Sequence, residues 1–434
     1  MRRRQASRGG GIIIRNEASG LGIDYLWPVA SERVAKKSVA GVVSFHSLQE
    51  FYTNAVTASP KLTYNVSGAR VWSPHNLFLN SNTPATQSVA TLIGHQYTVS
   101  VRGTGSLTGS SGAAGIATAG APLTFIASGA TSTFTLSGTL LRMQMNRGAT
   151  PVEYMATTSA IRIGVAVDYH PTTHAPLGMI GEAVATNLLL NNEVLATQSV
   201  TTTAVAHTLS FWGTGTVTLS GTSTGAKVGT GADVRSSFAF TPTAGTLTLT
   251  VSGSVVDAQL EANPVATSLI PTKASAVTRA VDNINVSTSA EWWNASGANS
   301  VVMWAAALNI ATNTSYMSLH GGTDAERIIF DTSSGTRQGR VLVHDNNVLQ
   351  ATLTSAAGTP VAGTTYKLAA AIAAADFALS VNGAAVLTAA SGTLPTANTM
   401  NVCGPITGGR NIFFKKHKIV PRRMTNAELV SEAT

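Results

Sequence analysis

One ordered series of short segments occurs twice in this chain of 434 residues. The segment NLFLN at 76–80 returns as NLLLN at 187–191, and ATQSV at 85–89 returns unchanged at 196–200, so both matches have an offset of 111 residues. Further matches follow in the same order and end near residues 157 and 272. Because a solenoid needs at least three stacked repeats, a unit that occurs twice predicts a tandem pair of related domains.

Both copies show the residue pattern of β-strands. Apolar residues alternate with Thr or Ser at 97–101 (YTVSV), 132–136 (STFTL) and 246–251 (TLTLTV). Alternation with a period of two is typical of a half-buried antiparallel strand, and the Gly, Ser and Pro clusters between these segments are typical of turns. Helical patterns are limited to short segments at 47–52 and 425–429, and the second has the spacing of a capping box. We therefore predict an all-β fold of antiparallel, jelly-roll-like β-sandwiches.

The chain divides into four regions. The duplicated modules are expected at 61–160 and 161–280, and a third β-sandwich at 281–434, where three more tryptophans and longer strands occur. In this third region Asn382 and Gly383 stand between two apolar runs, which predicts a β-hairpin because both central positions of a type I′ turn need a positive φ. The first 60 residues are basic, contain a glycine-rich stretch and show no core pattern of their own, so we expect an irregular N-terminal arm that anchors the protein to a partner.

The net charge of the chain is unevenly distributed. Charged residues make up only 11% of the chain, and the net charge is +8. Residues 1–40 carry +5 and residues 405–434 carry +4, so the remainder carries −1. A basic terminal arm can bind nucleic acid or an acidic protein surface. We favour a protein surface, because no aromatic residue stands between the first arginines to stack on bases. The expected docking residues are Arg2, Arg3, Arg4, Arg8, Arg15 and Trp27.

Several functional classes lack the residues that they need. No apolar run reaches the ~18 residues of a membrane-spanning helix, and the apolar patch after the first arginines is too short for the core of a signal peptide. The single cysteine excludes a disulfide framework and a cysteine-based zinc site. His170 and His174 have a helical metal-ligand spacing, but nearby prolines disfavour a helix. Asp324, Glu326 and Asp331 are interpreted as solvated turn residues, so we predict no catalytic residue, metal ion or cofactor.

Aromatic rings and one polar turn are the candidate ligand surfaces. Trp212 follows a phenylalanine and Trp292 precedes Trp293, and neighbouring residues of a strand face opposite sides of the sheet. One ring of each pair is therefore expected to be exposed, either to stack on a sugar or to pack against a neighbouring subunit. The sequence HDNN at 344–347 has the polar groups of a calcium or sugar loop, but a hairpin turn explains it fully. The candidate carbohydrate-binding residues are Trp212, Trp292, Trp293, His344, Asp345 and Asn347.

Two adjacent segments resemble a known protein family. Residues 257–272 (DAQLEANPVATSLIPT) and 276–282 (AVTRAVD) are similar to a signature of tailed-bacteriophage virion proteins, in which a carbohydrate-binding-module-like β-sandwich precedes a concanavalin/laminin-G-like lectin domain. The resemblance covers about residues 160–434, and the repeat extends it back to about residue 70. The first copy departs from the pattern at Asn146, where the family has a Glu. The other similar segments are 168–189, 366–383 and 421–429.

The resemblance implies a non-catalytic structural component of a phage virion, in the head or in a tail fibre or spike. Its lectin-like domain would attach the particle to host-surface glycans, and its N-terminal arm would bind capsid, portal or tail proteins. It also implies a homo-oligomer, with a trimer favoured, that assembles in the host cytoplasm and is exposed on the extracellular particle without membrane insertion. The alternatives are a purely structural capsid or tail decoration protein without glycan binding, and a polysaccharide depolymerase.

Overall fold

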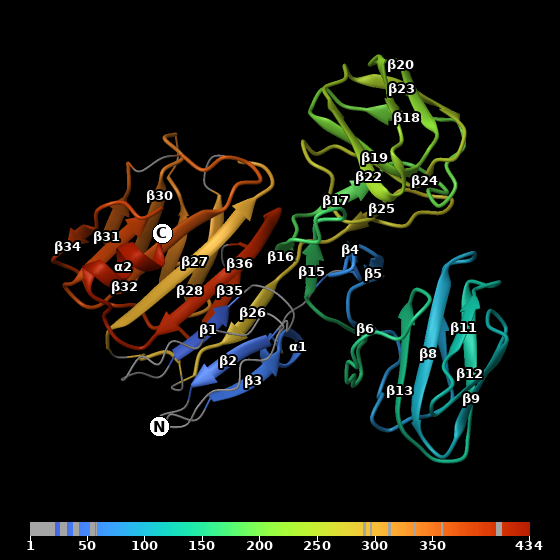
Figure 1. Ribbon diagram of the computed structural model, residues 1–434, viewed down its shortest axis with the longest axis horizontal. Coiled ribbons are helices and arrows are strands. Elements are labelled where there is room, and N and C mark those ends of the chain that lie inside the picture. The colour runs from blue at the N-terminus through green and yellow to red at the C-terminus, as the bar shows by residue number, and fades with distance from the viewer. Residues whose placement is uncertain are drawn as a thin grey trace.

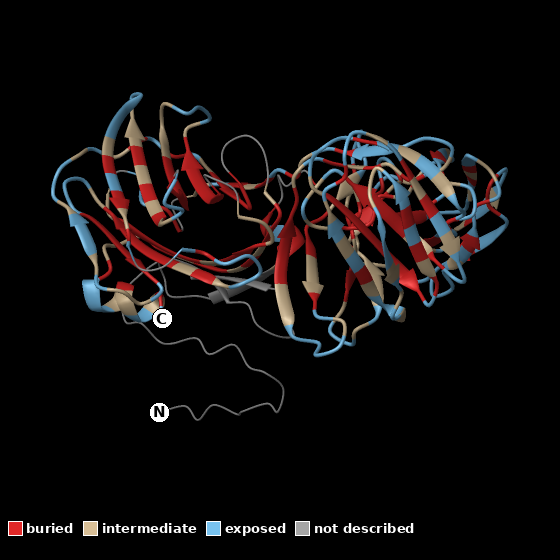
Figure 2. Cartoon of the chain, turned by 90° about the horizontal axis from the view of Figure 1, so that it is seen from above, coloured by how far each residue is buried: buried red, intermediate tan, exposed pale blue. Residues whose placement is uncertain are grey.

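Antiparallel β-strands build almost all of the protein. The computed structural model describes residues 22–26, 33–37, 43–52, 57, 59–289, 292–295, 297–310, 314–333, 335–356, 359–404 and 410–434. Two small β-sandwiches and one larger sandwich are connected by short strands (Figure 1). Figure 2 shows that the buried residues follow the strands, whereas the exposed residues gather in the connecting loops. This architecture confirms the predicted all-β fold.

Module 1, the first small sandwich, packs a four-stranded sheet against a three-stranded sheet. The strand orders are β10-β9-β12-β7 and β11-β8-β13. In β12 the side chain of Phe134 is buried in the core while Thr135 is exposed, as a period of two requires. The strands are β7 (Gln87–Ala90), β8 (Gln96–Gly103), β9 (Ser106–Ser110), β10 (Gly115–Thr118), β11 (Leu123–Ile126), β12 (Thr131–Ser137) and β13 (Leu140–Arg147).

Module 2, the second small sandwich, has the same sheet plan. Its strand orders are β21-β20-β23-β18 and β22-β19-β24, so β18 to β24 take the places of β7 to β13 one for one. The duplicated sequences therefore fold alike. The strands are β18 (Gln198–Thr202), β19 (His207–Gly213), β20 (Thr216–Gly221), β21 (Gly225–Val228), β22 (Gly231–Phe240), β23 (Gly245–Ser252) and β24 (Val256–Glu261).

A buried asparagine holds the closing segments of each module together. In module 2 the amide of Asn187 donates to the carbonyl oxygens of Ala258 (3.1 Å) and Ile270 (2.9 Å). Its side-chain oxygen accepts from the backbone N–H groups of Leu189 and Leu260, both at 3.1 Å. Asn76 of module 1 makes the four equivalent bonds, with the same distances. The asparagine that begins each repeat thus satisfies four buried backbone groups in each copy.

Replacing either asparagine is expected to destabilise its module to a similar extent. Asn76→Ala removes the partner of two buried N–H and two buried C=O groups. Asn187→Ala removes the acceptor of two buried N–H groups, while the two C=O groups keep the Asn192 amide at 2.9 and 3.5 Å. We expect a loss of about 2–3 kcal/mol of unfolding free energy in each variant. Urea unfolding measures the loss. Ser199→Ala is the control, because its hydroxyl bonds to Thr248 at the exposed surface and its removal should cost less than about 0.5 kcal/mol. Equal losses in Ser199→Ala and Asn187→Ala would contradict the assignment.

The C-terminal sandwich packs a ten-stranded sheet against a six-stranded sheet. The larger sheet follows the order β3-β2-β1-β36-β27-β32-β33-β34, with β16 also pairing with β36 and β15 with β16. The smaller sheet has the order β26-β35-β28-β29-β30-β31. Phe330, Phe377 and Phe414 are among the large side chains buried between the two sheets. The strands from 281 onward are β26 (Ile284–Ser287), β27 (Asn299–Ala307), β28 (Ser315–His320), β29 (Arg327–Thr332), β30 (Gly339–Asp345), β31 (Val348–Thr354), β32 (Tyr366–Ile372), β33 (Phe377–Val381), β34 (Leu387–Ala389), β35 (Thr399–Val402) and β36 (Ile412–Val420).

Part of the N-terminal region belongs to this large sandwich, which corrects the expectation of an arm without a core. β1 pairs with β36, with Tyr25 opposite His417, and β2 and β3 extend the sheet beyond it. The side chains of Leu48, Phe51 and Tyr52 are buried in the core of the C-terminal sandwich. The sequence hides this core because strands at the far end of the chain complete it. The elements are β1 (Gly22–Leu26), β2 (Arg33–Lys37), β3 (Val43–Ser47) and α1 (Leu48–Phe51).

Short strands form a connector between the three sandwiches (Figure 1). β4 pairs with β5, β6 with β14, and β17 with β25. The expected boundary at residue 161 places β15 and β16 in module 2, whereas β16 pairs with β36 of the large sheet. The connector strands are β4 (Leu62–Tyr64), β5 (Arg70–Trp72), β6 (His75–Asn76), β14 (Arg162–Ile163), β15 (Ala166–Tyr169), β16 (Pro176–Gly181), β17 (Ala185–Asn187) and β25 (Val277–Arg279).

The predicted C-terminal helix and hairpin turn are confirmed. Helix α2 (Asn426–Glu432) begins after Thr425, whose side chain accepts from the backbone of Glu428 while the Glu428 side chain accepts in return. The buried Leu429 packs against the outer face of the large sheet. Asn382 and Gly383 have φ values of 48° and 74° and connect β33 to β34, as the turn chemistry predicts.

Candidate functional site

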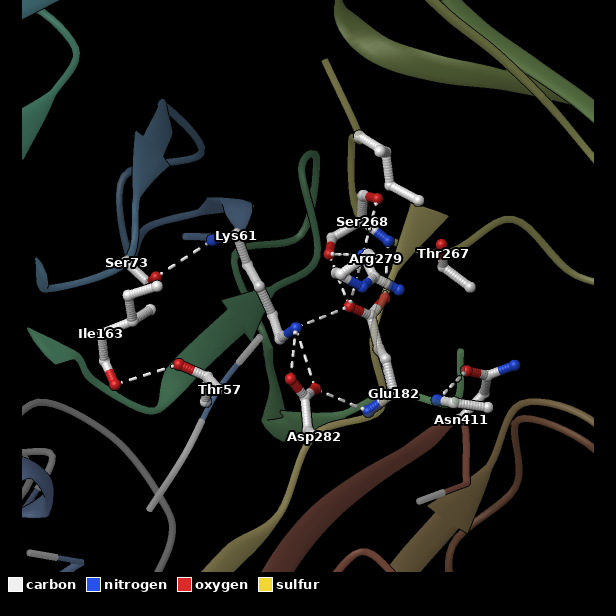
Figure 3. Close-up of polar contacts among 12 residues, drawn as sticks. Thr57, Lys61, Ser73, Ile163, Glu182, Thr267, Ser268, Arg279, Asp282 and Asn411 are labelled. Carbon is white, nitrogen blue, oxygen red and sulfur yellow. Dashed lines mark hydrogen bonds and ion pairs between the residues drawn. The ribbon is translucent and has the colours of Figure 1, made fainter. Parts of the chain in front are cut away.

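A buried cluster of charged side chains lies where the connector meets module 2 and the C-terminal sandwich (Figure 3). The Lys61 ammonium lies 2.8 Å from Asp282 Oδ2 and 3.0 Å from Glu182 Oε2. Arg279 Nη1 lies 3.1 Å from the same Glu182 oxygen. All four side chains are at most 1% exposed. Two cations and two carboxylates thus balance one another in a buried site, which we call the junction cluster.

The members of the junction cluster come from three separate segments of the chain, and Asp282 lies three residues after Arg279. Lys61 directly precedes β4, Glu182 follows β16, and Arg279 ends β25. Ser268, in the closing loop of module 2, donates its backbone N–H and its hydroxyl to Glu182, both at 2.5 Å. Asp282 Oδ2 accepts the backbone N–H of Glu182 at 2.9 Å. The cluster therefore connects three parts of the chain that are far apart in the sequence, around residues 61, 182 and 268–282.

The carboxyl group of Glu182 is held in its ionised form. Burial alone raises its pKa, but Arg279, Lys61 and the two Ser268 donors outweigh burial and lower the pKa to about 2. Glu182 is therefore an anion at neutral pH, and its charge is available to both cations.

A half-buried carboxylate, that of Asp168, connects strands β15 and β4. Asp168 in β15 accepts the backbone N–H of Tyr64 at 2.8 Å and that of its neighbour Tyr169 at 3.0 Å. Burial raises the pKa of Asp168 to about 6, and the two N–H donors only partly oppose that rise. This carboxylate therefore ties β15 to β4.

The junction cluster coincides with the segments that resemble phage virion proteins. Arg279 and Asp282 belong to the segment 276–282, and Ser268 belongs to 257–272. Sequence reasoning missed the cluster because Lys61 and Asp282 are separated by 221 positions. The sequence hint of the cluster is that charged residues occur within these otherwise mostly uncharged segments.

The end of each small module is fixed by a different residue in the two copies. In module 2 the Glu261 carboxylate accepts the backbone N–H of Thr267 at 2.9 Å and its hydroxyl at 2.5 Å. In module 1 the amide of Asn146 instead donates to the carbonyl oxygens of Arg147 (2.8 Å) and Thr150 (2.9 Å). Both side chains fasten the loop after the last strand, so the acidic residue of the motif has a structural role in this chain.

The expectation that one ring of the Phe211–Trp212 pair is exposed is wrong. Phe211 lies in the core of module 2, and Trp212 is only 2% exposed although it faces away from that core. Its indole N–H donates to the hydroxyl of Tyr64 at 2.7 Å, and the guanidinium of Arg235 lies 4.8 Å from the ring centre. The connector hairpin of the same chain therefore covers Trp212, and neither a sugar nor a second subunit can reach the ring face.

The expectation of exposure is also wrong for Trp292 and Trp293, which are 1% and 4% exposed. Both backbone N–H groups bond to the carbonyl oxygen of Ser289, at 3.1 and 2.9 Å, so the pair lies in a turn. The alternation rule applies to extended strands and does not hold there. Both rings contribute to the core of the C-terminal sandwich.

The three remaining candidates lie together on one rim of the C-terminal sandwich. His344 and Asp345 end β30, and Asn347 in the following turn is exposed, with a φ of 63°. Asp345 accepts from the hydroxyl of Thr393 in a neighbouring loop. Glu326 accepts the backbone N–H groups of Asn346 and Thr396, both at 2.8 Å. This hairpin rim, formed by His344, Asp345 and Asn347 with the loops of Glu326 and Thr393, presents polar groups on a braced scaffold.

The other residues considered for chemistry have structural partners. Asp331 was interpreted as a solvated turn residue, which is wrong: it lies in β29, is buried, and pairs with Arg340 through two bonds of 2.8 and 2.6 Å. Asp324 is exposed and pairs with Arg327 at 2.6 Å. His170 accepts two backbone N–H groups of its own loop through Nδ1. In the described part of the chain, no three His, Cys, Asp or Glu side chains are placed to hold a metal ion.

Among the described residues, no helix has the length and apolar character needed to cross a membrane. The expected docking residues lie outside the described residues, and they are Arg2, Arg3, Arg4, Arg8, Arg15 and Trp27.

Comparisons with known proteins yield weak structural likenesses. No family model and no curated protein matches the chain. It is similar to the Ruminococcus gnavus IT-sialidase CBM40 bound to α2,3-sialyllactose, with 11% identity over 32% of this chain and 84% of that chain and a TM-score of 0.29. It is also similar to domain 4 of a GH43 extracellular arabinanase from Geobacillus stearothermophilus in complex with arabinotriose, with 14% identity over 40% of this chain and 84% of that chain and a TM-score of 0.28. A Trypanosoma rangeli sialidase shares 18% identity over 31% of this chain and 22% of that chain, with a TM-score of 0.24. Likenesses at these TM-scores carry no argument about function.

Proposed function

We propose that this chain is a non-catalytic structural component of a tailed-phage virion, of the fibre or spike type. The observation that supports this role is the junction cluster: the motif residues Glu182, Arg279 and Asp282 are used to join domains inside the protein. Buried ion pairs of this kind join segments inside the protein and are not accessible to a substrate. The protein would assemble in the host cytoplasm as a homo-oligomer, with a trimer favoured, and be displayed on the extracellular particle.

The C-terminal sandwich is the part that we propose to contact host-surface glycans. The support for this assignment is the hairpin rim, where polar side chains of three loops converge and Asn347 is exposed. Amide and carboxylate groups held in a fixed geometry can form paired hydrogen bonds with sugar hydroxyls without losing much entropy on binding. The proposed contact does not include Trp212, Trp292 or Trp293, because all three are buried.

A glycan array probed with the full chain tests the glycan contact. We expect binding to at least one bacterial surface polysaccharide, and Asn347→Gly should weaken it about 5- to 10-fold through the loss of one or two hydrogen bonds. Glycine keeps the positive φ of this position. Asn382→Gly is the matched control, because Asn382 also has a positive φ in an exposed hairpin of the same sandwich. It should bind like the wild type.

Three outcomes would contradict parts of the proposal. A silent array would favour a purely structural decoration protein. Equal loss of binding in Asn347→Gly and Asn382→Gly would remove the rim as the contact. Release of new reducing ends from a host polysaccharide would contradict the non-catalytic role and favour a depolymerase.

A further inference from the structure

We propose that Lys61 and Asp282 condense to form an intramolecular amide bond, with Glu182 carrying a proton between the reacting groups. The three side chains meet in the junction cluster (Figure 3). Lys61 Nζ lies 2.8 and 3.1 Å from the two oxygens of Asp282. It also lies 3.0 Å from Glu182 Oε2. A nucleophile, an electrophile and a proton carrier are thus within reaction distance in one site.

The electrophile is already oriented. Asp282 Oδ2 accepts the backbone N–H of Glu182 at 2.9 Å. When a nitrogen adds to the carboxyl carbon, negative charge develops on the carboxyl oxygens, and a fixed N–H donor stabilises that charge. Attack requires Lys61 Nζ, which lies 2.8 and 3.1 Å from the two carboxyl oxygens, to approach the face of the carboxyl group. The flexible lysine stem permits that movement.

The electrostatics of the junction cluster favour the condensed product. Lys61 and Asp282 are charges that have been removed from water, which carries a large desolvation cost. The reaction replaces both charges with one neutral amide. Arg279 remains paired with Glu182 at 3.1 Å, so the buried site stays balanced after the reaction. Exclusion of water also protects the amide from hydrolysis.

The atoms balance without any further reactant. The Lys61 ammonium transfers one proton to the Asp282 carboxylate, which gives a neutral amine and a neutral carboxylic acid. The amine lone pair attacks the carboxyl carbon and a C–N bond forms. Glu182 accepts a proton from the attacking nitrogen and returns it to the departing hydroxyl group. The C–O bond breaks and one water molecule leaves, with no change of oxidation state.

The charge state of Glu182 suits this role. Burial raises its pKa, but Arg279, Lys61 and Ser268 outweigh burial and lower the pKa to about 2, so Glu182 is ionised at neutral pH and faces Lys61 as a carboxylate. Loss of the Lys61 charge during the reaction removes one of the groups that lower this pKa. Glu182 therefore becomes more basic at the step in which it must take up the proton.

Two other lysine ion pairs in the described residues lack this arrangement. Lys416 and Lys418 each lie 2.8 Å from Glu432, but their side chains are 10% and 12% exposed. They share one carboxylate, and that carboxylate is occupied by two cations. No second acid is placed beside them to carry a proton, so they provide an internal control.

The amide bond would close a loop between positions that are 221 residues apart. Both small modules lie within that loop. Residues 61 and 282 would then stay covalently joined even when every sandwich unfolds. A covalent connection of this kind restricts the unfolded chain in the same way as a disulfide that closes a long loop.

Intact-mass spectrometry of the purified, denatured full chain tests the proposal directly. We expect a mass about 18 Da below that of the sequence, equal to one water molecule. A tryptic digest should contain a branched peptide that joins the Lys61 and Asp282 segments. The full sequence mass, together with a linear Lys61 peptide, would overturn the proposal.

Four variants assign the reacting atoms. Asp282→Asn should lose about 17 Da, because ammonia replaces water as the leaving group. Lys61→Arg should show its full sequence mass, and Glu182→Gln should condense at least 10-fold more slowly. Lys416→Arg is the control and should keep the wild-type deficit. Loss of about 18 Da in Lys61→Arg, or wild-type condensation in Glu182→Gln, would overturn the assigned roles. The measurement on the wild-type chain decides the matter even where a variant fails to fold.

Discussion

Deletion of residues 1–60 is expected to prevent folding of the C-terminal sandwich. The deletion removes Leu48, Phe51 and Tyr52, whose side chains are 1–3% exposed and fill the core of that sandwich. Truncating one buried Leu or Phe costs about 2–5 kcal/mol, and domains are typically stable by only about 5–15 kcal/mol. The deletion also removes β1 from its pairing with β36. Soluble yield and thermal unfolding followed by circular dichroism measure the effect.

Deletion of residues 1–20 is the matched control, because β1 begins at Gly22. We expect this shorter deletion to keep the wild-type unfolding temperature and to reduce incorporation into phage particles. A soluble 1–60 deletion with the wild-type transition would contradict the assignment of residues 22–52 to the core. Normal incorporation of the 1–20 deletion would contradict the docking role of the residues that it removes, which are Arg2, Arg3, Arg4, Arg8 and Arg15.

Arg279→Met is expected to lower the unfolding free energy by about 3–5 kcal/mol, because it leaves a buried carboxylate with one cation too few. Arg279 also donates to the carbonyl oxygen (3.0 Å) and hydroxyl (2.8 Å) of Ser268, and these bonds are lost as well. Calorimetric unfolding at pH 7 measures the change. Arg327→Met is the control, since its partner Asp324 is 76% exposed and stays solvated, and it should cost less than about 1 kcal/mol. Similar losses in both variants would contradict a special role for the junction cluster.

Acid should remove the contribution of Glu182 within a defined pH range. In the ion-paired form of the junction cluster its pKa falls from an ordinary 4.5 to about 2, because the nearby cations and Ser268 outweigh the effect of burial. On acidification Glu182 is therefore protonated at a lower pH in the folded state than in the unfolded state. The stabilisation by its charge is complete above pH 4.5 and is lost as the pH falls toward 2. Arg279→Met removes one of these cations and should shift this loss to higher pH. An unchanged acid-unfolding profile would argue against this linkage.

The strand pattern of this protein could be predicted because it is local. Thr135 and Phe134 alternate between solvent and core as a period of two requires. The Asn382–Gly383 turn and the capping box of Thr425 and Glu428 also depend on residues that are close in sequence. In these places each residue's own conformational preference agrees with the fold.

Burial between distant segments could not be predicted in the same way. Trp212 faces away from its own module, and only the hairpin that carries Tyr64 covers it. Trp292 and Trp293 lie in a turn, where the rule for strands has no force. The burial of Lys61 could not be predicted from its neighbours in the sequence, because its partner Asp282 lies 221 positions away. The burial of these side chains depends on contacts that the topology sets, so the local sequence pattern could not predict it.

Strand β36 joins the two ends of the chain within one sheet. Its residues 412–414 pair with β16 and its residues 416–419 pair with β1. A ribosome therefore releases β1 almost a whole chain length before the strand that must pair with it. Each small module contains all strands of its own sheets and can close during synthesis, whereas the large sandwich must wait for β36. Pairing over such a distance is slow and leaves strand edges exposed to aggregation. The order of synthesis thus sets the order of folding, with the modules first and the two ends of the chain last.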